Sequence, residues 1–468
     1  MFIIFSFFIL VVSIVLFKKA CGFLTLTHFN LGMFVFYNLL FIMFFGSIEI
    51  LYGWDPPGYL PAFKASEDLR LFGWFVIMYT MLALPTGMVL ASNFFKIDSM
   101  KKLTQRYIQS EPVISDRPLF KKVMIVFSAL SAFVALYTIF SQGEKIPLLA
   151  LFSGEENYSL LLKLRRESGF KSENFIIQNI LILFSGVLPV FFYTSFFYWK
   201  KFSTRTNYLW FFSLFIVAVF NSIYHMVKGP VVFLLLGLVF ANFLISRKMP
   251  NWYWGITVIL FFFILMGVLT VFFQGVTVNA WGILPFLLVG IGAFFHRIIF
   301  GQIVCSYLAF QYFPNLHPYL WFSSTGRGIH EFFGLPFSED YGLTVMGLFR
   351  PEQVAAGTAG HATTVFIGEA WANFGLFGVI IAPIWVGFAI QILNILFLKL
   401  EKNPFNMAIY VYTAFLLPID SSFIGFYYPA WLIQYLLVIA LVYFVYYYLK
   451  GKIKFSIKKD DGFARADS

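Results

Sequence analysis

Apolar runs of about 20 residues recur from one end of this chain to the other, each long enough to cross a hydrocarbon layer as a helix. Inside lipid only helices and closed barrels satisfy their own backbone hydrogen bonds. Hydrophobic residues make up 60% of the 468 residues and charged residues 12%, and the mean hydropathy is +0.82. These values exclude an ordinary soluble domain. They predict an all-α, polytopic membrane protein that forms a single integral membrane domain over residues 1–468.

The apolar runs predict about 11 transmembrane helices. We expect them at residues 2–17, 31–51, 72–94, 122–141, 176–197, 207–226, 229–246, 253–274, 365–396, 404–423 and 427–449. The lysines of the first run follow it, whereas a cleaved signal peptide carries its basic residues first, so we expect this run to be retained as a span. Residues 281–312 are apolar but too short for two spans. We expect a re-entrant or interfacial hairpin there, broken near Pro285, Gly290, Gly292 and Gly301.

Charge divides the connecting loops into two groups. When the loop between residues 95 and 122 is placed in the cytoplasm, 22 of the 33 Lys and Arg fall on that side and ten outside, with Arg297 unassigned. Fifteen of the 22 acids fall outside. This is the positive-inside distribution of membrane proteins, so the net charge of +11 does not indicate nucleic-acid binding. We expect the N-terminus outside and the C-terminus, with a basic tail at 450–468, in the cytoplasm.

Two external loops, residues 141–173 and 314–360, are longer than most connections. Loops of this length tend to carry function, and both contain large apolar residues that can pack, so we expect ordered caps. The first contains "LKLRRESG", in which Arg165 and Arg166 present guanidinium groups that suit phosphate oxygens. The same motif is equally consistent with an amphipathic surface helix in which Lys163 pairs with Glu167.

Other cations are dispersed along the external segments. Lys228 lies in a tight turn between two spans, and Arg327 and Arg350 lie in the second loop. Arg297 lies inside an apolar stretch, where a cation is costly unless it has a partner or lines a polar cavity, so we expect it to be functional. For Arg327 and Arg350, a solvated structural role and a ligand contact are both consistent with the sequence.

The stretch "GHATTVFIGEAWANFG" places His361 and Glu369 at the start of a late span. On a continuous helix Glu369 would lie about 12 Å along the axis from His361 and about 80° around it, so both could face one cavity without contacting each other. A histidine at this boundary can also be a simple interfacial residue. Cys21 and Cys305 have no redox or zinc spacing, and no phosphate-binding loop or metal motif is present, so we expect no metal and no cofactor.

Four segments together resemble the Wzy-type oligosaccharide repeat-unit polymerases, which are related to the O-antigen ligases. They are "LRRESG", "KGP", "HRIIFGQ" and "GHATTVFIGEAWANFGLFGVIIAP", within about residues 150 to 400. In the ligases a histidine followed by Asn, Ser or Gln precedes a GxxG motif by nine further residues. Here His361 is followed by Ala362, and twelve residues separate Ala362 from the GxxG of Gly375 and Gly378.

The resemblance implies a GT-C-like glycosyltransferase in the bacterial cytoplasmic (inner) membrane, with its site facing outside. It would polymerise polyprenyl diphosphate-linked oligosaccharide repeat units into a surface polysaccharide. Its partners would be the lipid-linked donor and acceptor, membrane lipid, a chain-length regulator and a flippase, with no nucleic acid. The alternatives are an O-antigen ligase-like transferase, a non-enzymatic transporter of lipid-linked oligosaccharides, and a structural scaffold.

The candidate residues fit such a transfer. Cations near the membrane boundary would neutralise the departing diphosphate, and His361 or Glu369 would take the proton of the acceptor hydroxyl. Because diphosphate is a good leaving group, the reaction needs no metal ion. The expected diphosphate ligands are Arg165, Arg166, Lys228, Arg297, Arg327 and Arg350.

Overall fold

The computed structural model describes most of the chain outside residues 247–300. The described residues are 1–25, 28–53, 66–113, 118–153, 158–167, 174–246, 301–324, 341–357, 361–362, 364–420, 422–427 and 429–451, with isolated positions 253, 257, 260, 261, 264, 265, 268, 292, 299 and 334. Within them the chain forms helices joined by turns, which confirms the all-α membrane architecture.

Nine helical segments of the described part are long and apolar enough to cross a membrane. They lie within five residues of nine expected spans. They are Phe2–Cys21, Leu31–Leu51, Glu67–Phe94, Leu119–Phe140, Ile177–Lys201, Arg205–Ile223, Lys228–Ser246, Phe366–Lys399 and Ile424–Leu449. The expected span at 253–274 and most of the expected hairpin lie outside the described residues. Of that hairpin region, the structure describes α15 (Gly301–Tyr312) as a helix of 12 residues.

The expected span at 404–423 is wrong as a continuous helix. Helix α20 (Pro404–Leu416) has only 13 residues, and the short 3-10 turn η4 (Pro418–Asp420) follows it. Pro418 has no N–H to continue the helix, and it restricts the residue before it to extended backbone. Leu417 accordingly has ψ 117°. The chain therefore turns within the bundle at this point.

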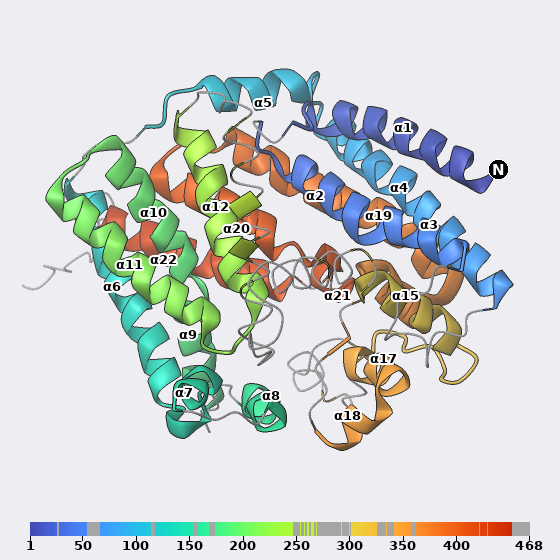
Figure 1. Cartoon of the computed structure of the whole chain (residues 1–468). Helices are drawn as coiled ribbons and strands as arrows, with labels where there is room; N and C mark the ends of the chain where they lie inside the picture. Colours follow the sequence, from blue (N-terminus) through green and yellow to red (C-terminus); the bar gives the residue numbers. More distant parts are fainter. Residues whose placement is uncertain are drawn as a thin grey trace, which may run out of the picture.

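The helices form two groups that lie side by side in Figure 1. In both groups, spans are interrupted: a π-helical turn, η1 (Leu40–Phe44), joins α2 to α3, and Val187 separates α9 from α10. The first group comprises α1 (Phe2–Cys21), α2 (Leu31–Leu39), α3 (Phe45–Leu51), α4 (Glu67–Phe94), α15 and α19 (Phe366–Lys399). The second comprises α6 (Pro118–Phe140), α9 (Phe175–Gly186), α10 (Leu188–Lys201), α11 (Arg205–Ile223), α12 (Lys228–Ser246), α20 and α22 (Ala430–Leu449).

Helices α4 and α19 approach each other closely enough for backbone to meet backbone. A Cβ atom on Gly87 would collide with the carbonyl of Ile384, and a Cβ on Gly387 would collide with the carbonyl of Leu84. Small residues permit this approach between membrane helices, where dispersion contacts rather than hydrophobic burial hold helices together. The pair α4–α19 is thus the backbone-to-backbone core of the first group.

A polar side chain ties the two groups together. The Oδ1 atom of Asn394 on α19 accepts a hydrogen bond of 3.0 Å from the Tyr410 hydroxyl on α20 and one of 3.4 Å from the backbone N–H of Leu31. All three residues are buried. A hydrogen bond buried between membrane helices fixes their register, because lipid offers the same groups no alternative partner.

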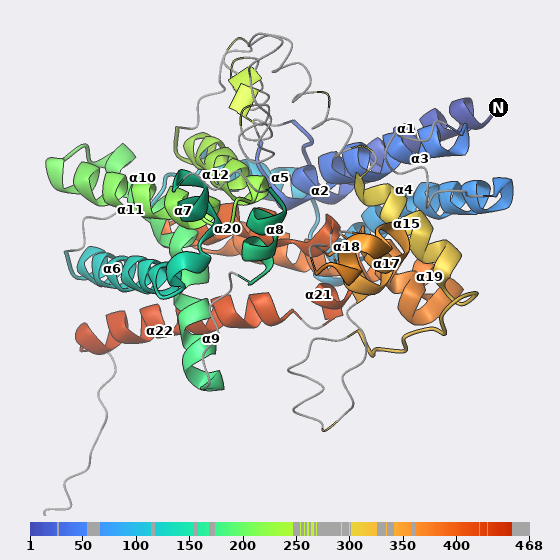
Figure 2. The same ribbon diagram turned by 60° about the horizontal axis from the view of Figure 1, so that its bottom comes forward.

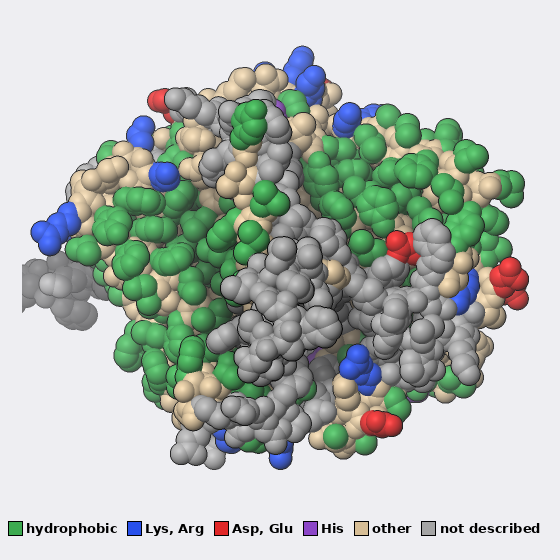
Figure 3. Space-filling view, viewed as in Figure 1, with side chains coloured by type: hydrophobic (Ala, Val, Ile, Leu, Met, Phe, Trp, Pro, Cys, Tyr) green, Lys and Arg blue, Asp and Glu red, His purple; other side chains and the backbone are tan. Residues whose placement is uncertain are grey.

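The described connecting helices gather at opposite ends of the bundle (Figures 1 and 2). Helix α5 (Met100–Gln109) lies across one end, called here the α5 end. At the other, called the loop end, lie α7 (Pro147–Phe152), α8 (Tyr158–Glu167), α17 (Tyr341–Phe349) and α18 (Pro351–Ala355). Both long loops predicted as ordered caps thus contribute helices to the same end. Hydrophobic side chains cover most of the described surface in Figure 3, with Lys and Arg mainly at its margins.

Adding a methyl group at the α4–α19 contact should destabilise the protein. We expect Gly87→Ala and Gly387→Ala each to lower the free energy of unfolding by about 1–3 kcal/mol, because the backbones must separate. The measurement is unfolding of the purified protein in mixed micelles. The matched control is Gly186→Ala, where the nearest atom to the added Cβ is 3.8 Å away. Equal stability of all three variants would contradict the close contact.

Candidate active site

The helices of the first long loop pack against the turn between α11 and α12. Leu161 on α8 and Leu148 on α7 share a small buried cluster with Met226 of that turn. The backbone N–H of Leu148 also donates to the carbonyl of Tyr224 at 3.4 Å. This packing holds α7 and α8 against the turn between α11 and α12, and it places the charged residues of α8 near that turn.

Arg165, Lys228 and a histidine that the sequence analysis missed lie around this contact. Arg165 is exposed on α8, one helical turn after Leu161, and Lys228 is half-buried as the first residue of α12. His225 lies in the turn between α11 and α12, three residues before Lys228, and near Arg165. Its burial and, secondarily, the nearby Arg165 guanidinium lower the pKa of His225 from 6.5 to about 4. The imidazole is therefore neutral at pH 7 beside a permanent positive charge.

Arg350 and His361 lie in the second long loop, whose helices α17 and α18 lie beside α8 in both ribbon views (Figures 1 and 2). Arg350 is exposed at the N-terminus of α18, and His361 is exposed shortly before α19. Hydrogen bonds from backbone N–H groups attach the segment after His361 to α17 and to α15. The N–H of Ala362 donates to the carbonyl of Gly342 at 3.0 Å, and the N–H of Val365 donates to Ser306 Oγ at 3.3 Å.

The expected helix linking His361 and Glu369 does not exist. Described residues from 361 to 365 are non-helical, and α19 begins only at Phe366. His361 therefore lies on an anchored loop and Glu369 in the first turn of the helix. The separation of about 12 Å calculated for a continuous helix does not apply.

Glu369 is 4% exposed, and its carboxylate accepts four hydrogen bonds. Oε1 accepts one from Ser324 Oγ at 3.2 Å. Oε2 accepts three, from Ser422 Oγ at 3.0 Å and from the backbone N–H groups of Phe423 at 2.6 Å and Ile424 at 3.1 Å. An ionised carboxylate is a pure acceptor and satisfies all four donors. These contacts give Glu369 a positioning role, and its predicted role as a base stays a prediction.

Helix α19 is interrupted at Gly375, six residues after Glu369 and two after Asn373, where φ of 57° and ψ of −137° are not helical. A break frees carbonyls that a continuous helix would bond internally. Here the carbonyl of Ala372 accepts from Leu320 N–H at 2.9 Å, and that of Asn373 accepts from Trp321 N–H at 3.3 Å. The start of the second loop is thus hydrogen-bonded along the break, at the first glycine of the GxxG motif.

Tyr319, Trp321 and Phe322 of the same loop segment lie beside two aromatic residues from elsewhere in the chain, Phe374 and Tyr427. These five residues are called here the aromatic shelf. Trp321 is 67% and Phe322 54% exposed. Both have positive φ, 44° and 71°, a conformation that costs about 1–3 kcal/mol for such residues and is common at functional sites. The Phe322 ring lies 4.7 Å from Phe374 and 5.7 Å from Tyr427. The Tyr427 hydroxyl is buried and meets no hydrogen-bond partner among the described residues.

Three predicted diphosphate ligands cannot be placed. Arg297 and Arg327 lie outside the described residues, as does the side chain of Arg166, whose backbone belongs to α8. The site residues that the sequence analysis missed are His225, Ser324, Asn373 and Ser422. The tight turn of "YHMVKGP" was a usable signal for His225, because it places that residue three positions before Lys228. The serines had no local signal, since they meet Glu369 only through the fold.

Acidification should loosen the first loop. The folded-state pKa of His225, about 4, is below the unfolded value of 6.5, so stability is lost as pH falls from about 6.5 to about 4 and is unaffected above that window. We expect faster amide hydrogen exchange in α7 and α8 at pH 5 than at pH 7.5, after correction for intrinsic rates. His225→Gln should remove most of this difference, and an unchanged pH response in that variant would contradict the assignment.

Substitutions of Glu369 should separate its structural and chemical roles. Glu369→Ala removes the acceptor of four donors, two of which are buried backbone N–H groups, and should destabilise the protein by about 3 kcal/mol or more. Glu369→Gln can keep one oxygen on Ser422, Phe423 and Ile424 while its amide donates to Ser324, so we expect a loss of only about 1 kcal/mol. Thermal unfolding measures both, with Glu352→Gln on exposed α18 as the control. Similar losses for the Ala and Gln variants would contradict this hydrogen-bond assignment.

Comparison of the chain with protein-family models, curated proteins and solved structures gives no match. The roles of the site residues therefore depend on their own chemistry and placement. That placement brings Arg165, His225, Lys228, Arg350 and His361 to the loop end of an apolar helical bundle. Cations and imidazoles at one boundary of a membrane protein form the candidate active site.

Proposed function

We propose that this membrane protein is a glycosyltransferase that polymerises polyprenyl diphosphate-linked oligosaccharide repeat units into a surface polysaccharide. One observation carries the proposal: both long loops fold onto the same end of the bundle, where they and the turn between α11 and α12 supply cations and imidazoles. A lipid-linked donor has its tail in the bilayer, its diphosphate at the headgroup level and its sugars in water. A site for it needs positive charge at the membrane boundary beside a group that accepts a proton.

These residues account for each bond, proton and charge of the transfer. The acceptor hydroxyl oxygen forms a bond to the anomeric carbon while the bond from that carbon to the diphosphate oxygen breaks. The hydroxyl proton passes to His361, which is exposed and held on an anchored loop, and the negative charge stays on the departing diphosphate. Arg165, Lys228 and Arg350, with Arg166, Arg297 and Arg327 as further predicted ligands, stabilise that charge.

The remaining features support substrate positioning. Neutral His225 accepts or donates hydrogen bonds beside Arg165 without adding charge repulsion between cations. The aromatic shelf offers the exposed rings of Trp321 and Phe322, against which the apolar face of a sugar can be buried. Glu369 holds the shelf segment in place through Ser324. In this proposal the loop end faces outward from the bacterial cytoplasmic membrane, and a chain-length regulator and a flippase act with the enzyme.

A transporter of lipid-linked oligosaccharides is the second candidate, because discontinuous helices such as α19 are common at transporter binding sites. In those sites the freed carbonyls coordinate ions or substrate. Here the carbonyls of Ala372 and Asn373 are hydrogen-bonded to the second loop instead. A transporter leaves the donor intact, whereas a transferase releases free polyprenyl diphosphate. An O-antigen ligase-like transferase also releases it, and differs in using an acceptor other than a second lipid-linked repeat unit.

The test is turnover by the purified protein with lipid-linked repeat units, followed as released polyprenyl diphosphate and as a polymer ladder on gels. His361→Gln should lower the rate at least about 100-fold, the contribution expected of a general base. Arg165→Ala and Arg350→Ala should each slow release by about tenfold or more.

The control is Lys145→Ala, an exposed cation of the first loop outside the proposed site, which should retain activity. If wild-type protein moves lipid-linked units across vesicles without releasing polyprenyl diphosphate, the transporter is correct. If all site variants polymerise at the rate of the control, the site assignment is wrong.

A further inference from the structure

Helix α5 is an amphipathic helix fixed across the α5 end of the bundle (Figure 1). Met100, Thr104 and Tyr107 are buried, while Lys101, Lys102 and Arg106 are exposed. A helix with an apolar side seated in a membrane protein and a cationic side facing out lies at the level of the lipid headgroups. Its outer side therefore meets phosphate groups rather than acyl chains.

Helix α5 is held by hydrogen bonds at its C-terminus and in its middle. At its C-terminus the buried Lys402 Nζ donates to the carbonyls of Tyr107, Ile108 and Ser110 at 2.9, 3.0 and 3.1 Å. In the middle of α5 the Thr104 hydroxyl donates to the carbonyl of Cys21, the last residue of α1, at 3.1 Å. Cations at a helix C-terminus stabilise it through the helix dipole as well as by hydrogen bonding. The middle of α5 is thus fixed against the end of α1.

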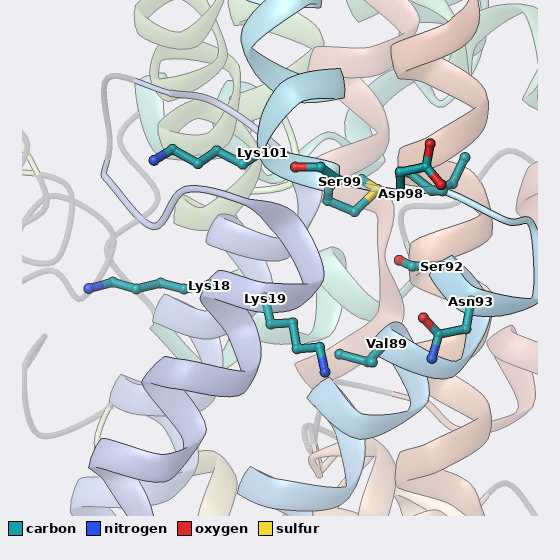
Figure 4. Close-up of a pocket in the computed structure, with 10 residues that line it drawn as sticks. Lys18, Lys19, Val89, Ser92, Asn93, Asp98, Ser99 and Lys101 are labelled. Carbon is teal, nitrogen blue, oxygen red and sulfur yellow. The ribbon is translucent and has the colours of Figure 1, made fainter.

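A cavity of about 270 Å³ opens where α1, α4 and α5 meet (Figure 4). In this view Lys18 and Lys101, from α1 and α5, extend to the same side, with their amino groups directed away from Ser92, Asn93 and Asp98, while Lys19 points towards Val89 of α4. Three lysines against a single acid, Asp98, make the lining cationic. The remaining lining residues are Ser92, Ile97, Ser99 and Met100.

The polar wall of this cavity is built into the core. Ser92 is 6% exposed, and its hydroxyl accepts a hydrogen bond of 2.8 Å from Gln391 Nε2 on α19. The same amide donates to the carbonyl of Ala20 on α1 at 2.7 Å. These buried bonds hold α1, α4 and α19 at fixed spacing. The cavity is therefore preformed, which lowers the entropic cost of binding a ligand.

Helices α1 and α4 carry exposed apolar side chains close in sequence to the residues that line the cavity. Val15 lies one turn before Lys18 and Lys19 on α1 and is 60% exposed. On α4, Leu90 and Phe94 are 48% and 71% exposed. A free phosphate ion would gain nothing from this surface, whereas a phospholipid would bury its acyl chains against it. The combination favours a lipid as the source of the phosphate group.

We propose that the cavity between α1, α4 and α5 binds the headgroup phosphate of an anionic phospholipid, whose acyl chains run along the exposed side chains of α1 and α4. Lys18, Lys19 and Lys101 supply the charge, and Asn93 and Ser99 offer hydrogen-bonding groups. Each lysine near a membrane surface adds about 1 kcal/mol of attraction for anionic lipid. This site is separate from the loop end, and it does not depend on the proposed glycosyl transfer.

The experiment uses the full-length protein, purified and delipidated in mild detergent, and titrated with phosphatidylglycerol, phosphatidylcholine or inorganic phosphate. Binding is measured as the rise in melting temperature with ligand concentration and, independently, as bound lipid by native mass spectrometry. We expect phosphatidylglycerol to bind more tightly than phosphatidylcholine, and inorganic phosphate to give no rise. Replacing Lys18, Lys19 and Lys101 with Gln should weaken phosphatidylglycerol binding by at least about tenfold.

Two further variants distinguish binding in the cavity from general attraction to surface charge. Replacing Lys122, Lys201 and Lys399, three exposed lysines outside the cavity, with Gln removes the same charge and should change binding less than about threefold. Replacing Lys18, Lys19 and Lys101 with Arg keeps the charge and should retain binding. Equal weakening in both Gln variants would show general surface attraction and overturn the proposal. A rise with inorganic phosphate equal to that with lipid would overturn the choice of a lipid.

Discussion

The break in α19 at Gly375 is the feature on which the loop end depends. A membrane helix normally satisfies its own carbonyls, and breaking it leaves buried acceptors that need new donors. Here the donors come from the backbone of Leu320 and Trp321, so the second loop is attached to the helix by main-chain hydrogen bonds. Because the attachment uses backbone groups only, the loop side chains need not be buried to hold it. The side chains of Trp321 and Phe322 accordingly remain exposed.

Glu369 extends the attachment to a third segment. Its carboxylate joins Ser324 of the second loop to Ser422 and the N–H groups that begin α21 (Ile424–Tyr427), so one side chain fixes two regions nearly 100 residues apart. A buried carboxylate is stable only with its donors in place. The carboxylate of Glu369 thus holds the start of the second loop against α19 and the segment before α21.

Much of the fold was predictable because lipid imposes strong rules on sequence. Nine spans could be located from hydropathy, since an apolar run of about 20 residues has few other uses. The prediction of a span at 404–423 failed because hydropathy does not report where a helix stops, and Pro418 stops α20 within the bundle.

The candidate site was less predictable from the sequence than the fold. Arg165 and His361 were identifiable as unusual polar residues at a boundary, but the placement of Arg165 near His225 and the hydrogen bond of Glu369 with Ser422 arise from tertiary structure that no local pattern encodes.

The contact between α4 and α19 also bears on how the chain is assembled. Gly87 and Gly387, which let the two backbones meet, are 300 residues apart in the chain. During synthesis α4 enters the membrane long before α19 is made, and its small-residue groove then faces lipid or other helices inserted early. Packing of the first helical group is therefore completed only when the C-terminal third of the protein has been inserted. Truncated chains that end before α19 would lack the partner of α4, and cellular quality control could recognise them by that uncovered groove.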